Sequence, residues 1–574
     1  MAKINYKTNL KGDLLGGLTA AIIAIPVGLA FGEASGLGPK YGLYTAAILA
    51  IVASFVGGTK TLISDPTGPM TVVAATVVTA ALADFGPGLD GLGLSGPAWL
   101  YVVITFALTG LFQIIFGFLN IAQYIKYIPF PVVSGFMGGI GVIIILLQLY
   151  PLMGYDSPKG AINIMSGIME PIRGLKYESL LLGGITVATI YLFPFITKKV
   201  PAILMALIVG TASYLILNYF ADFSAVQTIS SFKSEVPTPK LDVFEHFDWG
   251  IMASCAGLAV TLAALGTIDT LLTSVVADSL TKTKHKGNRE LIGQGLGNFI
   301  AALFGGFPGA GSTTGTVINI KSGGRTNISG ITKGVILLIV ILTMGPYVMY
   351  IPKAVLAGIL LTIGIGIVDV KGLRLLPKVP RVDAFILLLT LVITVFDTLL
   401  DAVAVGALIA TVSFMKKMAD VMDDMNQDGE LKDFSKDPRI PKAMGDRVFV
   451  KVLDGPMFFG FADQFREQMR AIDKYEALII DMKRVPFMDE TGLIVLEEAI
   501  HELHIKGVDL YITGANDAIY TQLVKVKIPG NLVDEDHFFP FFKHCLKHIR
   551  YSFEEKAAED KAAGISEASD KIEE

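Results

Sequence analysis

The chain has 574 residues, of which 52% are hydrophobic and only 17% are charged. This composition is too apolar for a soluble protein of that length, so most of the chain is expected to lie in a lipid bilayer. The net charge of −5 argues against a nucleic-acid partner, which requires a basic face. Cys255 and Cys545 lie far apart in the sequence, which argues against a disulfide framework and against a cysteine-based zinc site.

The first part of the chain is a series of apolar segments. A bilayer core about 30 Å thick requires roughly 20 apolar residues per helix. Twelve windows of that kind begin near residues 14, 41, 97, 131, 178, 200, 250, 290, 328, 352, 383 and 400. Residues 1–13 lead into the first window without a small-residue cleavage site, so we expect a retained anchor.

Two further segments, Pro69–Ala81 and Ser312–Ile320, are too short or too rich in glycine and threonine to cross alone. Each follows a turn-forming stretch, 64–69 in one case and 305–311 in the other. Paired short segments in corresponding positions of two halves are typical of discontinuous helices in transporters built from inverted repeats. Counting them as spans three and ten predicts fourteen spans in two seven-span inverted repeats, about 12–222 and 248–422.

The distribution of basic residues predicts the orientation. Lysine and arginine gather in the loops after the even-numbered spans, which places those loops and both termini in the cytoplasm. The loop that carries Lys159, Arg173 and Lys176 fits this scheme less well. We therefore expect a multi-pass protein of the cell inner (plasma) membrane, with the loop 220–248 outside.

After about Met415 the sequence becomes rich in charge, which indicates a soluble domain. The predicted organisation is a membrane domain at 1–422, a linker at 423–445, an α/β domain at 446–552 and a charged, disordered tail at 553–574. Within the soluble domain, the pattern predicts strands at 448–452, 477–482 and 508–512 and helices at 462–472, 492–506 and 538–548.

Several motifs resemble the sulfate permease (SulP) superfamily. They are Gly12–Thr19, Ile25-Pro26 and Pro39–Tyr44 near the start of the chain. The soluble domain resembles a STAS domain, whose motif has a phosphorylatable serine or threonine where Thr491 stands. Within the superfamily, Ile268–Ser274 and Gly309–Gly315 are most similar to sodium-dependent bicarbonate transporters of the BicA type. The resemblance implies an elevator carrier, in which a core of spans one to four and eight to eleven moves against a gate of the remaining spans. It also implies a homodimer to which the STAS domain contributes.

The two half-helices predict an anion site. A helix N-terminus presents free N–H groups and roughly half a positive charge, so two that meet head-on supply about one unit. Thr71 near the first N-terminus, and Ser312 and Thr313 at the second, add hydroxyl groups to this substrate-binding site. The alternative is that these side chains only cap the helices.

Asp269 predicts a cation site, because a carboxylate within an apolar span is costly and indicates function. Thr273 lies four residues later on the same helical face. Together with the carbonyl of Gly311 and the hydroxyl of Thr313, they offer the oxygen ligands that sodium prefers. The alternative is an aspartate that is protonated or bonded to neighbouring hydroxyls. Asp65, which precedes the first half-helix, is expected to be a cap. All seven histidines lie outside the predicted spans, so a histidine proton relay is not expected.

The substrate follows from one missing charge. Anion exchangers of the superfamily carry an arginine in the second half-helix, where this chain has Gly315. Two helix dipoles with a bound sodium ion match a monoanion better than a dianion. Bicarbonate is therefore ranked before sulfate, with dicarboxylate and chloride after them. An uncoupled anion channel and a membrane-anchored STAS sensor stay open as alternatives. No catalytic constellation and no motif for a covalently bound cofactor is found, so an enzyme is not expected.

Thr491 is the predicted regulatory residue of the soluble domain. It stands at the start of a predicted helix, where a phosphate would interact favourably with the helix dipole but would repel Asp489 and Glu490. The alternative is that Thr491 is only the N-cap of that helix.

Overall fold

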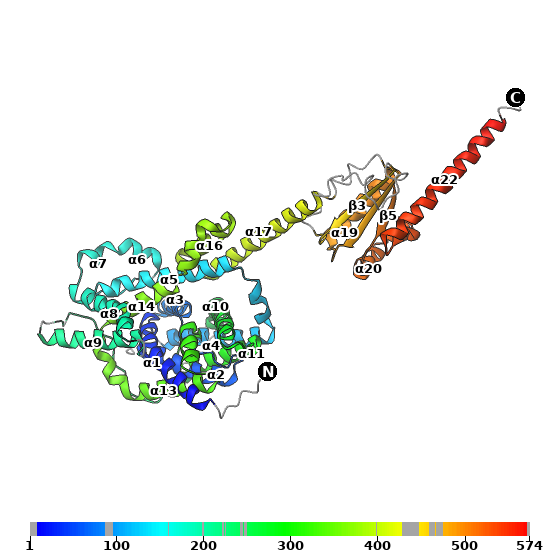
Figure 1. Ribbon diagram of the computed structural model, residues 1–574. Coiled ribbons are helices and arrows are strands. Elements are labelled where there is room, and N and C mark those ends of the chain that lie inside the picture. Colours follow the sequence, from blue (N-terminus) through cyan, green and yellow to red (C-terminus); the bar gives the residue numbers. More distant parts are fainter. Residues whose placement is uncertain are drawn as a thin grey trace. The chain divides into compact units, whose positions relative to one another are not determined.

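The computed structural model describes residues 9–86, 96–158, 160–197, 200–220, 223, 225–232, 234–241, 245, 249–397, 399–427, 447–458, 465 and 475–570. The chain forms two compact units, Met1–Ala410 and Thr411–Glu574 (Figure 1). The predicted helix at 462–472 lies outside the described residues except at Phe465, and so does the linker from 428 onward.

The membrane unit has a helix at each predicted span. The first half contains α1 (Leu10–Ala34), α2 (Pro39–Val56), α3 (Gly68–Phe85), α4 (Gly96–Phe118), α5 (Phe130–Leu152), α8 (Tyr177–Ile196) and α9 (Ala202–Phe220). The second contains α10 (Trp249–Thr281), α11 (Gly287–Leu303), α12 (Thr313–Lys321), α13 (Ile328–Met344), α14 (Lys353–Ile367), α16 (Arg381–Phe396) and α17 (Leu399–Gln427). Short helices α6 (Ala161–Gly167), α7 (Met169–Arg173) and α15 (Val370–Leu375) lie in connections. Among the described residues, 11 helices are long and apolar enough to cross a membrane.

The helices pack in two groups. In the first, which we call the core group, α11 packs against α2 and α4, α13 packs against α1 and α2, and α10 packs against α4. In the second, the gate group, α5 packs against α14 and α16, and α8 packs against α9 and α14. The groups meet where α1 contacts α9 and α14 and where α3 contacts α5. Helix α3 packs against α4 and α10, and α12 packs against α1 and α10, so the core group contains the helices of spans one to four and eight to eleven.

Glycine permits close helix packing in the core group. A Cβ atom added to Gly295 of α11 would lie 2.5 Å from the carbonyl oxygen of Gly110 in α4, and a Cβ on Gly110 would lie as close to the carbonyl of Gly295. Any other residue would force the two backbones apart, which is why small residues mark tightly packed membrane helices.

Two short strands join the two halves of the membrane unit. β1 (Ser64–Asp65) pairs antiparallel with β2 (Ala310–Gly311), with Ser64 opposite Gly311 and Asp65 opposite Ala310. Because α3 begins three residues after β1 and α12 begins two residues after β2, this pairing brings the N-termini of the two helices to one place. Helix α12 is as short as predicted, with 9 residues, whereas α3 with 18 residues is longer than the predicted half-helix.

The N-terminal motif holds the far end of α12. Asp13 of α1 is fully buried, and its carboxylate accepts hydrogen bonds from the backbone N–H groups of Arg325 (2.7 Å) and Thr326 (2.9 Å) and from the Thr326 hydroxyl (2.7 Å). These residues form the loop between α12 and α13. The motif that resembles the SulP superfamily is thus an anchor for the half-helix.

The second unit contains a parallel sheet in the order β3-β4-β5-β6, formed by Val448–Asp454, Ala477–Arg484, Asp509–Thr513 and Phe538–Phe539. Its helices are α19 (Glu490–Ile505), α20 (Asp517–Lys525), α21 (Ile528–Asn531) and α22 (Phe542–Asp570), with a 3-10 turn, η7, at Glu535–His537. One face of the sheet packs on α19 and α20 through residues such as Ile480 and Leu496. The other packs on α22 through Tyr511 and Ile549.

Two expectations for this unit differ from the structure. Residues 553–570, predicted to be a disordered tail, continue helix α22. The segment is rich in alanine, glutamate and lysine, which are strong helix formers, so the same charge that suggested disorder also favours a helix. The predicted helix at 538–548 begins only at Phe542, because Phe538 and Phe539 form the edge strand β6.

Candidate functional site

The start of α12 is fixed by hydrogen bonds to the chain that enters α3. The backbone N–H of Ser312 donates to the carbonyl of Ile63 (2.7 Å), and the N–H of Ile63 donates to the Thr316 hydroxyl (2.9 Å). Ser312 is the N-cap of α12, because its hydroxyl accepts from the N–H of Gly315 (3.2 Å). The capping role considered for Ser312 is therefore real, and it leaves the first N–H groups of the helix without an intrahelical carbonyl.

The start of α3 is less fully capped. Its N-cap is Thr67, whose side chain makes no capping hydrogen bond. Thr71, predicted to bind the anion, is buried in the first turn, and its hydroxyl donates to the carbonyl of Thr67 (2.8 Å). Pro69 contributes no N–H at all. The N–H of Thr71 donates to the carbonyl of Thr67 (2.9 Å), so the N–H groups of Gly68 and Met70 are the ones in this turn without an intrahelical carbonyl.

The predicted substrate residues come from both helix starts. Ser312 is partly exposed and Thr313 is exposed at the beginning of α12. Thr71 lies across the strand pair at the beginning of α3 and is 2% exposed. The side chains of Ser312 and Thr313 are therefore accessible, whereas the side chain of Thr71 is buried.

Three of the four predicted sodium ligands are in contact. The hydroxyl of Thr273 in α10 donates to the carbonyl of Gly311 (2.9 Å) and lies 2.8 Å from the hydroxyl of Thr313. One turn earlier, the Thr270 hydroxyl accepts from the N–H of Gly311 (3.1 Å). One face of helix α10 is thus hydrogen-bonded to β2. This face carries the hydroxyl oxygens of Thr270 and Thr273.

Asp269 lies one turn before Thr273 on that face. The hydroxyl of Thr67 lies close to its carboxylate. Neither Asp269 Oδ2 nor Thr67 Oγ1 completes a hydrogen bond, although both atoms are buried. A buried carboxylate oxygen without a partner is costly, and a cation would relieve that cost. The donor set, which consists of oxygen atoms only, fits a hard cation such as sodium.

A buried ion pair that was not expected from the sequence lies beside this site. Lys333 of α13 is fully buried, and its ammonium donates to the carboxylate of Asp65 and to the carbonyl of Ser64 (2.7 Å). The expectation that Asp65 caps a helix is therefore wrong, because the carboxylate is taken by Lys333. The signal was present in the sequence, since Lys333 stands within an apolar span and the rule applied to Asp269 applies to it equally.

Gly315 lies beside the same ion pair. A Cβ added there would lie 3.2 Å from Asp65 Oδ2, 3.2 Å from Ser312 Oγ and 3.0 Å from Ile63 Cγ2. The position where related exchangers carry arginine is therefore close to the start of α12. The cation that this chain places nearby, Lys333, is already neutralised by Asp65.

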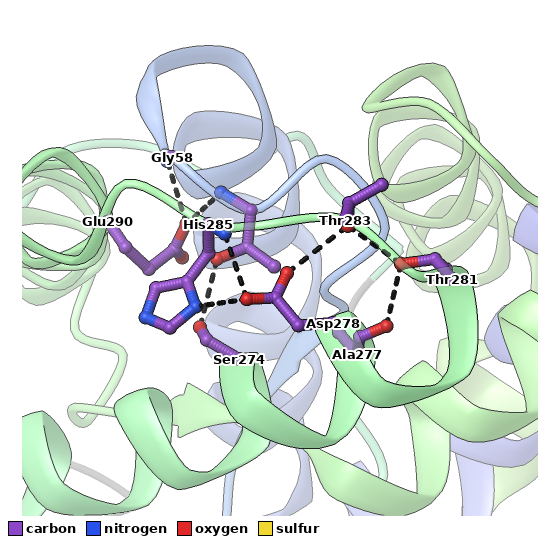
Figure 2. A network of polar contacts seen from close by, with 9 residues as sticks. Gly58, Ser274, Ala277, Asp278, Thr281, Thr283, His285 and Glu290 are labelled. Atoms are coloured by element: carbon purple, nitrogen blue, oxygen red, sulfur yellow. Dashed lines mark hydrogen bonds and ion pairs between the residues drawn. The ribbon is translucent and has the colours of Figure 1, made fainter. Parts of the chain in front are cut away.

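A polar network secures the loop before β1 (Figure 2). The buried carboxylate of Glu290 in α11 accepts from the N–H groups of Gly58 (2.8 Å) and Thr59 (2.7 Å). The Thr59 hydroxyl lies 2.9 Å from that of Ser274 in α10. Figure 2 shows that this network adjoins a second one, in which Asp278 accepts from the N–H of His285 (2.9 Å). The first network holds the chain leading to β1 against α10 and α11, and the second fixes the loop between these two helices.

The STAS motif is placed as expected, with one correction. Helix α19 begins at Glu490, and its N-cap is Asp489, whose carboxylate accepts from the N–H of Gly492 (2.7 Å). The view that Thr491 is only an N-cap is therefore wrong, because Asp489, two residues earlier, takes that position. Thr491 is exposed in the first turn of the helix, and its regulatory role stays a prediction.

Comparisons with known proteins cover both units. The model of the sulfate permease family matches residues 10–390, and that of the STAS domain matches residues 440–542. The bicarbonate transporter BicA of Picosynechococcus sp. is 39% identical over 536 residues, which cover 92% of this chain and 92% of that protein. BicA of Synechocystis sp. is 38% identical over 571 residues, covering 98% of each.

Solved structures agree with these matches. The transmembrane domain of a cyanobacterial BicA superimposes with a TM-score of 0.62 at 41% identity and covers 71% of this chain and 99% of that one. The overall structure of SLC26A9 gives a TM-score of 0.78 over 96% of this chain and 92% of that one, at 18% identity, so this likeness concerns the fold alone. The relatives are transporters, and none of those named is an enzyme. The chain therefore belongs to the sulfate permease family, as a polytopic membrane transporter of small anions with a C-terminal STAS domain.

Proposed function

We propose that this protein takes up bicarbonate together with sodium, and that it does so by an elevator movement of the core group against the gate group. The observation that carries the proposal is the buried Oδ2 of Asp269, which completes no hydrogen bond and lies beside the joined starts of α3 and α12. It is supported by relatives 38% and 39% identical that are named bicarbonate transporters. The cell inner membrane, with both termini cytoplasmic, is the proposed location.

The anion would bind to the N–H groups at the two helix starts. Two dipoles contribute about one positive charge. The side chain of Lys333 adds none, because Asp65 neutralises it within the core group. A monoanion such as bicarbonate therefore matches the site without further charge, while a dianion would leave one charge uncompensated. Ser312 and Thr313 would donate from their hydroxyls, and Thr71 would support the turn that presents the α3 donors.

The sodium ion would bind between α10 and the start of α12. Asp269 supplies the negative charge, and Thr273, Thr313 and the carbonyl of Gly311 supply neutral oxygens. The ion would then place its charge beside the anion, at the position where an arginine of other family members would act. Each ion favours binding of the other, which is the physical basis of coupled transport.

The elevator movement is supported by the division of the packing. Both candidate sites lie entirely in the core group, since their residues belong to α3, α10, α12 and the β1–β2 pair. The two groups contact each other only through a few helix pairs among the described residues, mainly α1 with α9 and α14 and α3 with α5. One of them is polar: Lys353 of α14 bridges Glu33 of α1 (3.2 Å) and Asp156 (3.0 Å) after α5. A site carried by one rigid group past another needs such breakable contacts at the boundary.

A sulfate transporter is the second candidate. The high affinity sulfate transporter 1 of Stylosanthes hamata is 24% identical over 571 residues, which cover 92% of this chain. The same helix starts would bind sulfate if a further cation were present. An uncoupled anion channel would use the same helix starts without Asp269.

We also propose a homodimer in which the STAS domain contributes to pairing, as the resemblance implies.

The test uses the purified protein in liposomes. We expect an inward sodium gradient to accelerate uptake of labelled bicarbonate, and labelled sulfate to enter much more slowly under the same gradient. Replacement of external sodium by choline at equal ionic strength is the control. Bicarbonate uptake that is equally fast in choline would contradict sodium coupling, and faster uptake of sulfate would contradict the substrate.

A further inference from the structure

A cluster of metal-ligating side chains lies in the STAS domain, away from the transport site. Asp536 and His537 belong to η7, and His548 belongs to α22. One ligand atom of each residue lies within 4.8 Å of those of the other two. Asp536 is exposed, whereas both histidines are partly buried. Residues twelve positions apart are brought together because β6 turns the chain back into α22.

The hydrogen bond of His537 leaves one ring nitrogen for a ligand. Its Nδ1 lies 3.0 Å from the carbonyl oxygen of Leu510 in β5. A carbonyl only accepts, so Nδ1 carries the proton and donates it, which leaves Nε2 as an unprotonated acceptor. Metal-binding histidines are commonly held in this way, with one nitrogen on a backbone carbonyl and the other on the metal.

The rings around the cluster fix its orientation. His537 stacks on the buried ring of Tyr511, with centroids 4.1 Å apart, and the centroids of His537 and His548 are 5.8 Å apart. His548 also lies 5.3 Å from the ring of Phe539. Aromatic packing explains why the two imidazoles are held in place, but it does not explain the carboxylate of Asp536 at their edge.

The surroundings carry negative charge. Asp534 and Asp536 lie just before His537 in the sequence, and Asp509 is the first residue of the strand that carries Tyr511. Of these carboxylates, Asp509 is paired with Lys556 of α22 (3.2 Å). The remaining acidic groups give the cluster a field that attracts a cation.

We propose that Asp536, His537 and His548 bind a divalent transition metal, with Zn²⁺ as the best match. Zn²⁺ accepts imidazole nitrogen and carboxylate oxygen at about 2.0–2.2 Å in a tetrahedral arrangement, which places ligand atoms roughly 3.4 Å apart. The ligand atoms of this cluster need to converge by little more than 1 Å, and exposed Asp536 can supply most of that movement. The fourth position would hold water. The ion would link η7 to α22 and so hold this helix on the sheet.

The experiment uses the full chain, purified in detergent and treated with a chelator. Titration with Zn²⁺ is expected to show one saturating site, and Co²⁺ at the same site is expected to give visible absorption bands. Asp536→Asn alters an exposed side chain and so leaves the fold intact, yet it should weaken Zn²⁺ binding roughly tenfold or more. His537→Ala and His548→Ala should do the same.

His544→Ala is the matched control, because His544 is exposed one turn before His548 on α22 and is not part of the cluster. It should bind Zn²⁺ as the unmodified chain does. At the same concentration, Zn²⁺ should also raise the Tm of the unmodified chain and of His544→Ala by more than that of Asp536→Asn. The proposal is overturned if the chain shows no saturable Zn²⁺ binding. It is equally overturned if Asp536→Asn keeps full affinity, or if His544→Ala loses as much affinity as His548→Ala.

Discussion

At the scale of single residues, the buried acids of the membrane unit fall into two kinds. Asp13, Asp65 and Glu290 each have hydrogen-bond or ion-pair partners in the core group. Asp269 differs, because its Oδ2 is buried among the described residues without a partner. The first kind stabilises the structure, since removing such a group leaves buried donors unmatched. The second kind lowers stability and so indicates binding.

The difference predicts opposite effects of two similar substitutions. Asp269→Asn should abolish the stimulation of bicarbonate uptake by sodium and leave the Tm unchanged or higher, because an unmatched charge is removed. Glu290→Gln should lower stability by about 1–3 kcal/mol, because its NH2 group would face donors in either orientation, namely the N–H groups of Gly58 and Thr59 or the side-chain amide of Gln294. The two variants are compared by thermal unfolding in detergent and by uptake. Unchanged sodium stimulation in Asp269→Asn would remove the proposed cation site.

The Lys333–Asp65 pair allows a second prediction. Lys333→Met leaves the Asp65 carboxylate buried without a partner and should cost about 3–5 kcal/mol of stability. The double variant Asp65→Asn, Lys333→Met removes both charges and should recover a large part of that loss. Lys321→Met, at an exposed position in the last turn of α12, is the control and should be neutral. A double variant no more stable than Lys333→Met would show that the pair does not act as a unit.

At the scale of elements, hydropathy was sufficient to place the long helices, because a bilayer imposes length and apolar composition on each span. The shortness of α12 was also predictable from its glycine and threonine content. The β1–β2 pair was not, because strands of two residues have no periodicity to detect. The partner of Asp65 was missed for a related reason: it lies 268 residues away, and only the fold brings Lys333 to it.

The boundary between the core and gate groups gives a third prediction. Lys353, Glu33 and Asp156 all border a cavity of about 230 Å³ formed by α1, α3, α5 and α14. Exposed ion pairs contribute only about 0–1 kcal/mol, so Lys353→Ala should fold normally. Loss of the bridge between α1 and α14 should nevertheless make the cavity open more often on the proposed outer side.

A cysteine at Thr79, which lines that cavity, reports the opening. Thr79→Cys should react faster with an impermeant maleimide when combined with Lys353→Ala. The two native cysteines are buried and should not interfere, and burial raises the pKa of Cys545 to about 12, which suppresses its thiolate. Equal labelling with and without Lys353 would mean that the bridge does not restrain the two groups.

At the scale of the whole molecule, the two units divide the work. Every residue of the proposed anion and sodium sites lies before Ala410, within the membrane unit. The STAS unit has its own core on both faces of its sheet, and Thr491 and the histidine cluster belong to it. Composition alone indicated this division, because the change from apolar to charged sequence reflects the change of solvent.

A fourth prediction follows from that division. A chain truncated after Lys417 should retain sodium-dependent binding of bicarbonate with an affinity within about threefold of the full chain, although pairing and turnover can fall. Binding is measured on protein that elutes as a single folded species. Loss of binding by such a protein would assign part of the site to the STAS unit.

We propose that sodium and bicarbonate are transported together in one coupled step. The most direct measurement is the movement of labelled sodium into liposomes at equal sodium concentration on both sides, under an inward bicarbonate gradient at clamped pH. Thermodynamic reciprocity requires that the bicarbonate gradient drive sodium inward above its equilibrium distribution. We expect this accumulation with the unmodified protein and none with Asp269→Asn. Bicarbonate entry with no sodium accumulation in the unmodified protein would contradict coupled transport of the two ions.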